Sequence, residues 1–357
     1  MRYIAINNLR PGQKLGTSLI LPKGAVLLRR GSTLTASIIN NLARLGYQGL
    51  YIEDELSEGL EITDVISNEL RVKTQNELQR MFYNVESNIT SNVKKQVSNV
   101  KTMAKDIVDE ILCNRHAMVN IIDLRSYDDY TYGHSLNVTV LAVVLGTALK
   151  LSRNTIYELA LGALVHDIGK MFTEKQILNK PSRLTPEEFE IIKKHSELGY
   201  SYLAEKLDIP ERSTIVALQH HEQHNGNGYP NGLSGEDISL FGRIVSVADV
   251  YDALTADRPY RKAMLPSDAI EYIMGGYDTM FDPKCVQALV KKVAPYPIGT
   301  CVKLSTGEIA IVVKNYEATS LRPLVKLIED GKPSNHYINL SHDHSALNIT
   351  VKEIINL

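Results

Sequence analysis

The sequence predicts a mainly α-helical protein with a small α+β module at its N-terminus and a small all-β module at its C-terminus. Three observations lead to this fold class. The central region carries apolar residues at helical spacing, the first 60 residues alternate short apolar segments with turn residues, and the last segment returns to short strands. A chain of 357 residues, 44% of them hydrophobic, is long enough to bury the cores of two or three domains.

Residues 1–60 are predicted to form the α+β module. Pro11-Gly12, Gly31 and neighbouring turn residues separate short apolar segments such as TSLIL and AVLL. One helix is expected within LTASIINNLARLG, where Thr35 can cap the N-terminus and Gly46 can end it. The segment GLYIE then reads as a strand, and no set of catalytic residues is evident in this module.

Residues 61–115 are predicted to form a long helical linker with a narrow apolar stripe. The stripe consists of Leu78, Phe82, Val85, Ile89, Val93, Val97, Val100, Met103, Ile107 and Ile111. Its spacing lies between that of a straight helix face and that of a coiled-coil seam. Two partners suit such a stripe equally well: the same helix of a second copy, which would make a homodimer through residues 64–115, or the chain's own central domain.

Residues 116–292 are strongly helical and are predicted to form the central domain. Within it, TPEEFEIIKKH begins with a capping box of Thr185 and Glu188, and Pro186 occupies the first helical turn. Residues 293–357 form the all-β module, with strands expected at TCVKL, EIAIVVK, LVKLIE and ITVKEI. Thr306-Gly307 and Asp330-Gly331 supply turns between these strands.

Charge and cysteine content exclude several classes of function. The net charge of −2 provides no global basic field for DNA, RNA or anionic lipid. The three cysteines form no CxxC pair, which favours a reducing compartment and argues against a thiolate zinc site. No apolar run reaches the length of a membrane span, and the N-terminus does not resemble a signal peptide. We therefore expect a cytoplasmic protein.

Five histidines and two aspartates lie at expected helix ends or on apolar helix faces. They are His134, His166, Asp167, His195, His220, His221 and Asp249. A carboxylate among apolar neighbours is costly to bury unless something neutralises it. Imidazoles with carboxylates and no thiolate suit iron, manganese or zinc, and one carboxylate can bridge two ions. Each histidine alone has an ordinary structural explanation, but the set of seven favours a metal centre.

Four motifs follow one another in this region, HDIGK, HHE, NGNGYP and DVYDALTADRPYR, and His134 and His195 accompany them. Taken in this order, over residues 120–290, they resemble the HD-GYP family of HD-superfamily phosphodiesterases, which open cyclic di-GMP. It implies an HD-type helical domain that hydrolyses cyclic di-GMP to linear pGpG, and further to GMP, in bacterial second-messenger signalling. It also implies two divalent ions, iron or manganese, and a cyclic dinucleotide as partner.

The resemblance assigns a role to each site residue. The seven histidines and aspartates named above become metal ligands, with Asp167 bridging and catalytic. Lys170 becomes a catalytic contact to the scissile phosphate. The remaining assignments are substrate-binding residues: Gly228, Tyr229, Pro230, Arg258 and Arg261.

Two positions depart from the family pattern. Tyr130 replaces the glutamate that holds a third metal in some members, so two ions are expected here. Asn225 replaces the usual aspartate at the start of the loop, which retains turn propensity but loses a charge. The alternatives are a receptor that binds the dinucleotide with negligible turnover, a phosphodiesterase acting on cyclic GMP–AMP, and an HD-type hydrolase of mononucleotides, for which the GYP loop has no use.

Overall fold

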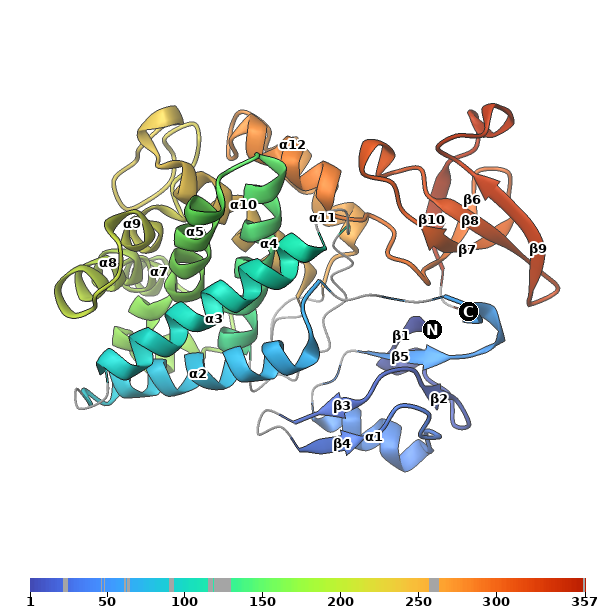
Figure 1. The fold of residues 1–357 in the computed structure, drawn as a ribbon, viewed down its shortest axis with the longest axis horizontal. Helices are drawn as coiled ribbons and strands as arrows, with labels where there is room; N and C mark the ends of the chain where they lie inside the picture. Colours follow the sequence, from blue (N-terminus) through green and yellow to red (C-terminus); the bar gives the residue numbers. More distant parts are fainter. Residues whose placement is uncertain are drawn as a thin grey trace. The chain divides into compact units, whose positions relative to one another are not determined.

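The computed structural model describes residues 1–21, 25–45, 47, 49–60, 62, 65–89, 93–114, 118, 130–256, 263–355 and 357. The chain divides into two compact units (Figure 1). The first contains residues 1–64, 118–130 and 290–357, and the second contains residues 65–117 and 131–289. No helix among the described residues is long and apolar enough to cross a membrane.

The N-terminal part of the first unit is an α+β module, as predicted. Its strands are β1 (Arg2–Ala5), β2 (Lys14–Leu15), β3 (Leu19–Ile20), β4 (Val26–Leu28) and β5 (Gly49–Glu53), and its helix is α1 (Ala36–Arg44). Strands β1, β5 and β2 form an antiparallel sheet in that order, while β3 pairs with β4. The Thr35 side chain accepts a hydrogen bond from the Ile38 amide, which confirms the predicted cap.

The C-terminal part of the first unit is a five-stranded antiparallel sheet. Its strands are β6 (Cys301–Leu304), β7 (Ile309–Lys314), β8 (Leu324–Glu329), β9 (Lys332–Asn339) and β10 (Val351–Ile354), in the order β10-β6-β7-β8-β9. Asp330 and Gly331 both have positive φ between β8 and β9, which is the backbone of a tight hairpin turn. The all-β module is therefore confirmed.

The second unit is helical and contains the histidines and aspartates named above. Its helices are α2 (Asn68–Glu86), α3 (Val93–Cys113), α4 (Tyr130–Ala148), α5 (Arg153–Val165), α6 (Lys175–Leu178), α7 (Pro186–Lys193), α8 (His195–Lys206), α9 (Glu211–Gln219), α10 (Leu240–Thr255), α11 (Pro266–Gly275) and α12 (Pro283–Lys292). Helix α4 is buried on nearly all sides from Leu136 to Leu145, as a central helix requires. Helix α9 packs against α5, α8 and α10.

The predicted long helix is divided into the two helices α2 and α3. Asn88 adopts a positive φ just after α2, and the chain then reverses. Side-chain hydrogen bonds from Ser67 to Glu110 and from Asn99 to Glu77 show that the two helices are antiparallel. Helix α3 also packs against α5, so the segment folds together with the central helices.

The apolar stripe is used within the chain. Eight of its ten members are buried: Leu78, Phe82, Val85, Val97, Val100, Met103, Ile107 and Ile111. Ile89 is exposed, and the side chain of Val93 lies outside the described residues. The second of the two partners considered for the stripe, the chain's own central domain, therefore covers it.

Candidate metal centre

Five elements bring the seven predicted ligands together. His134 lies one turn inside α4 and not at its start, because the helix begins at Tyr130. His166 caps the C-terminus of α5 and Asp167 follows it. His195 begins α8 as a new helix, whereas the sequence placed it inside the preceding one. His220 caps the C-terminus of α9, and Asp249 lies in α10.

Gly169 sets the distance between two of these elements. A Cβ atom at this position would collide with the carbonyl oxygen of His195. Only glycine therefore lets the short 3₁₀ turn η4 (Ile168–Phe172) lie directly against the start of α8. This close approach brings Asp167, at the beginning of the turn, to 3.6 Å from His195 Nε2.

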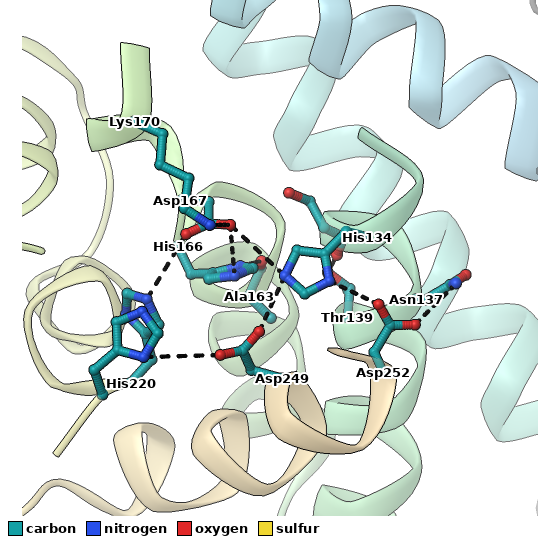
Figure 2. Close-up of polar contacts among 12 residues, drawn as sticks. His134, Asn137, Thr139, Ala163, His166, Asp167, Lys170, His220, Asp249 and Asp252 are labelled. Carbon is teal, nitrogen blue, oxygen red and sulfur yellow. Dashed lines mark hydrogen bonds and ion pairs between the residues drawn. The ribbon is translucent and has the colours of Figure 1, made fainter. Parts of the chain in front are cut away.

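The ligand atoms form two groups that meet at Asp167 (Figure 2). His134, His166 and Asp167 form the first group, and His195, His220 and His221 form the second. Asp167 Oδ2 lies 3.4 Å from His166 Nε2 and 3.6 Å from His134 Nε2. Asp167 Oδ1 faces the other group, at 3.8 Å from His220 Nε2. One carboxylate thus points an oxygen at each group, as a bridging ligand would.

Asp249 lies across both groups in the same way. Its Oδ1 is 3.0 Å from His134 Nε2, and its Oδ2 is 3.9 Å from His221 Nδ1. His134 and His221 belong to different groups. The two aspartates, one after α5 and one in α10, therefore connect the histidines of the two groups (Figure 2).

Backbone carbonyls fix the tautomers of three histidines. His166, His195 and His220 each direct Nδ1 at the carbonyl oxygen of Ala163, Ile192 or Val216, at 2.8, 2.7 and 3.0 Å. A neutral ring that donates from Nδ1 has its lone pair on Nε2. His195 Nε2 and His220 Nε2 are only 3.2 Å apart. Two lone pairs at that distance repel one another unless a cation lies between them.

Burial keeps most of these rings neutral. It lowers the pKa of His195 to about 4 and that of His221 to about 3, and it lowers the pKa of His220 well below its ordinary value. His134 differs: burial lowers its pKa, but hydrogen bonds with Asp249 and Asp252 outweigh burial and raise the pKa to about 9. A metal ion at His134 therefore has to displace a proton.

Among the seven proposed ligands, two buried atoms have no hydrogen-bond partner within the described residues, His166 Nε2 and Asp167 Oδ1. Buried polar atoms are costly to leave unpaired, so such atoms mark a missing partner. Burial raises the pKa of Asp167, but the Lys170 ammonium and His166 outweigh it and keep the carboxylate charged. The donor set of neutral imidazoles and two carboxylates therefore fits divalent metal ions.

Lys170 points its ammonium at the same carboxylate. Lys170 Nζ is 2.5 Å from Asp167 Oδ2, and its side chain is 25% exposed (Figure 2). The cation is thus held beside the histidine groups while remaining accessible. A charged donor in this position can contact an anionic group that approaches the centre.

The loop of Gly228, Tyr229 and Pro230 lies beside the centre, next to His221. The Tyr229 ring stacks on His221 with centroids 4.7 Å apart, and the Tyr229–Pro230 peptide is cis. Gly228 lies so close to the backbone at Glu222 and Gln223 that a Cβ atom would collide with it. The three predicted loop residues are therefore at the site, whereas Arg258 and Arg261 lie outside the described residues.

Sequence reasoning assigned no role to Glu222, which holds this loop. Its buried carboxylate accepts hydrogen bonds from the amides of Asn231 and Leu233, at 2.8 and 3.0 Å. A glutamate directly after two expected ligands was the available signal. Phe189 and Lys193 of α7 were also missed: the Phe189 ring makes an edge contact with Tyr229, and Lys193 Nζ lies over both rings. Their distance of about 40 residues from the loop along the sequence concealed this contact.

Comparisons with known proteins agree with the motifs. A family model described as "HD domain" matches residues 107–285. "Cyclic di-GMP phosphodiesterase PA4108" of Pseudomonas aeruginosa is 40% identical over 228 residues, which cover 63% of this chain and 55% of that protein. "3'3'-cGAMP-specific phosphodiesterase 3" of Vibrio cholerae is 37% identical over 179 residues, which cover 50% of this chain and 38% of that protein.

The chain spans about half the length of the curated relatives it matches. Among solved structures, Bd1817, an HDG"Y"P protein from Bdellovibrio bacteriovorus, aligns with a TM-score of 0.48 and 21% identity. That alignment covers 80% of this chain and 97% of the other.

Proposed function

Because the chain belongs to the HD domain family, as its motifs predicted, we propose that it is a metal-dependent phosphodiesterase that hydrolyses cyclic di-GMP to linear pGpG. Several relatives are named as cyclic di-GMP phosphodiesterases, including those of Pseudomonas aeruginosa and Thermotoga maritima. The single observation that carries the proposal is the close approach of His195 Nε2 and His220 Nε2, which face one another at 3.2 Å beside the buried Asp167 carboxylate.

Two divalent ions are proposed, held by the seven histidines and aspartates with Asp167 between them. Iron or manganese suits a set of imidazoles and carboxylates without thiolate. When bound, such ions stabilise charge on phosphoryl oxygens and lower the pKa of a water molecule. Hydrolysis would form a bond from the water oxygen to phosphorus and break the bond to the ribose 3′-oxygen, which would leave with a proton as the ring of the dinucleotide opens to pGpG. A second cleavage of the same kind would yield GMP.

The chain's own residues would orient the substrate and stabilise charge. Lys170, which keeps its ammonium beside Asp167, would contact the non-bridging oxygens of the scissile phosphate, where negative charge grows as the bond breaks. Gly228, Tyr229 and Pro230 would form the wall of the substrate entrance. Arg258 and Arg261 remain proposed contacts to phosphate or guanine, because guanidinium groups pair with both.

A cyclic GMP–AMP substrate is the second candidate. Three relatives of Vibrio cholerae are named as 3'3'-cGAMP-specific phosphodiesterases, at 37–39% identity. This identity is close to that of the cyclic di-GMP relatives, so overall similarity does not discriminate between the two dinucleotides. A receptor without turnover would be favoured by lost ligands, but the seven proposed ligands lie together.

Turnover separates these functions. Purified protein is incubated with cyclic di-GMP or 3'3'-cGAMP and Mn²⁺ or Fe²⁺, and linear products are separated by chromatography. We expect pGpG from cyclic di-GMP, and none from a variant with Asp167→Ala. Tight dinucleotide binding without product under every metal would favour the receptor, and faster cleavage of 3'3'-cGAMP would change the proposed substrate.

Location in the cytoplasm and a homodimer stay predictions. The stripe that suggested a dimer is buried between α2, α3 and the central helices, so a dimer through this segment would need an exposed face such as that of Tyr83 and Ile89. Light scattering at tens of micromolar protein measures the mass directly. A monomeric mass would remove the dimer.

A further inference from the structure

Four polar side chains form a continuous hydrogen-bonded chain from α2 to the metal centre. Arg71 Nη1 donates to Asn137 Oδ1 at 2.9 Å, and Asn137 Nδ2 donates to Asp252 Oδ1 at 3.1 Å. Asp252 Oδ2 lies 2.6 Å from His134 Nδ1. The chain therefore ends on a proposed metal ligand, and Figure 2 shows Asp252 between Asn137 and His134. Asn137, Asp252 and His134 are all buried.

Donors and acceptors alternate along this chain in only one direction. Arginine carries donors alone, so Asn137 must present its amide oxygen to Arg71. The Asn137 amide nitrogen then faces Asp252 and donates to it. The other Asp252 oxygen accepts the Nδ1 proton of His134, which leaves His134 Nε2 directed at Asp249 and Asp167. The guanidinium thus fixes the orientation of the Asn137 amide, whose oxygen and nitrogen ends have nearly the same shape.

We propose that Arg71 is a positioning residue for the metal centre, acting through Asn137 and Asp252 on His134. The inference rests on the proposed metal-binding function. Arg71 lies in the first turns of α2, outside residues 107–285 that the HD domain model matches. The helical segment before the matched domain therefore contributes to the centre through a hydrogen-bonded side chain as well as through packing.

The size of the expected effect depends on the position of Arg71, which is separated from the proposed ligand His134 by Asn137 and Asp252. Loss of a partner that contacts a metal-binding histidine directly weakens metal binding by about 10–100-fold. Arg71 acts two hydrogen bonds further out, through the neutral amide of Asn137, so the loss of its hydrogen bond corresponds to about a fivefold change. The effect is expected on metal affinity, because the hydrogen bonds from Arg71 through Asn137 and Asp252 end at the proposed metal ligand His134.

The test compares Arg71→Met, which keeps the apolar stem, with Arg71→Lys, which keeps one donor. Lys73→Met is the matched control: Lys73 is a cation two residues away on the same helix, and its partner is Asp106 at 3.6 Å. The dissociation constant for Mn²⁺ is measured by competition with a fluorescent chelator, which requires no turnover. Thermal midpoints and circular dichroism report folding.

Arg71→Met should raise the Mn²⁺ dissociation constant about fivefold, Arg71→Lys should restore part of the affinity, and Lys73→Met should match wild type. In an Asn137→Leu background, Arg71→Met should have no further effect, because the connection is already broken. Full additivity of Arg71→Met and Asn137→Leu, or equal Mn²⁺ affinities for Arg71→Met and Lys73→Met, would overturn the role of Arg71 without affecting the proposed function. If Arg71→Met does not fold, wild-type affinity in a folded Arg71→Leu variant, which also lacks a side-chain donor, overturns it equally. A wild-type protein that takes up no Mn²⁺ would overturn the proposed function as well.

Discussion

Asp252→Asn tests the support of the metal centre with the smallest possible change. In the wild type both oxygens of this fully buried carboxylate are used, one by His134 Nδ1 at 2.6 Å and one by Asn137 Nδ2 at 3.1 Å. An asparagine of the same shape must turn its NH₂ group toward one of these two neighbours. Two donors then face each other, whichever way the amide is placed.

The magnitude follows from the bonds that change. One hydrogen bond is lost, and the other loses the carboxylate charge that strengthens it, which together amount to about 2 kcal/mol. This corresponds to about a 30-fold weaker metal affinity, within the 10–100-fold range for residues that orient a metal-binding histidine. Because part of the charge that raises the pKa of His134 to about 9 is also lost, the ring binds its proton less tightly, which offsets part of the loss at pH values below that pKa.

The assay is Mn²⁺ binding at pH 7 by chelator competition, with metal content after dialysis as a second measurement. Asp237→Asn, at an exposed position in the short turn before α10, is the control for removing one carboxylate. Its affinity should equal that of the wild type. An unchanged Mn²⁺ affinity in Asp252→Asn, in a protein with a normal thermal midpoint, would refute the reasoning that Asp252 holds His134 for the metal.

Three further predictions concern charge, substrate binding and acid stability. Lys170→Met should lower kcat by about 100-fold while leaving dinucleotide affinity nearly unchanged, because a charged donor beside the reacting phosphate acts mainly in the transition state. Rapid-quench kinetics measure kcat and equilibrium binding measures the affinity, and wild-type turnover would contradict the proposed role of Lys170. Phe189→Ala should raise KM severalfold, because it removes a ring beside Tyr229 that can stack on a nucleobase. Ile191→Ala is the control, since Ile191 is similarly exposed on the same helix, and it should leave KM unchanged. Equal KM values for the two variants would exclude stacking on Phe189. Burial raises the pKa of Asp282, but the ion pair with Arg243 and the hydrogen bonds from the amides at the start of α12 outweigh burial and lower this pKa. The charged Asp282 therefore stabilises the fold above about pH 4, and this stabilisation is lost as pH falls through the lowered pKa of the folded state. Asp282→Asn should therefore lower the free energy of unfolding at pH 7 by about 3 kcal/mol, and urea titrations should show this difference shrinking below about pH 4; a constant difference would contradict the assignment.

Local rules predicted the elements well where their cause is local. The capping box of Thr185 and Glu188 forms as expected, with Pro186 in the first turn, because its hydrogen bonds join residues three positions apart. The break between α2 and α3 was missed although Asn88 carried a signal. Asparagine tolerates the left-handed conformation that ends a helix, and Asn88 adopts a φ of 54°. The apolar stripe continues on both sides of this turn, so its periodicity gave no sign of a reversal.

Residue type predicted the proposed ligands, but the connections among them depend on contacts between distant segments. The two carboxylates and five imidazoles could be predicted from the sequence because the chemistry of each residue type is recognisable by itself. The sequence does not reveal that Arg71 reaches Asn137 across 66 positions, or that Asn137 reaches Asp252 across 115. Each of these bonds exists only because α2, α4 and α10 are held at particular distances by their packed faces. The unexpected division of the long helix is what makes this possible: α3 packs against α5 and α2 packs against η4, close to Lys170. The segment that looked like a linker in sequence therefore packs beside the proposed metal centre, and the proposed role of Arg71 predicts that metal affinity is sensitive to changes in α2.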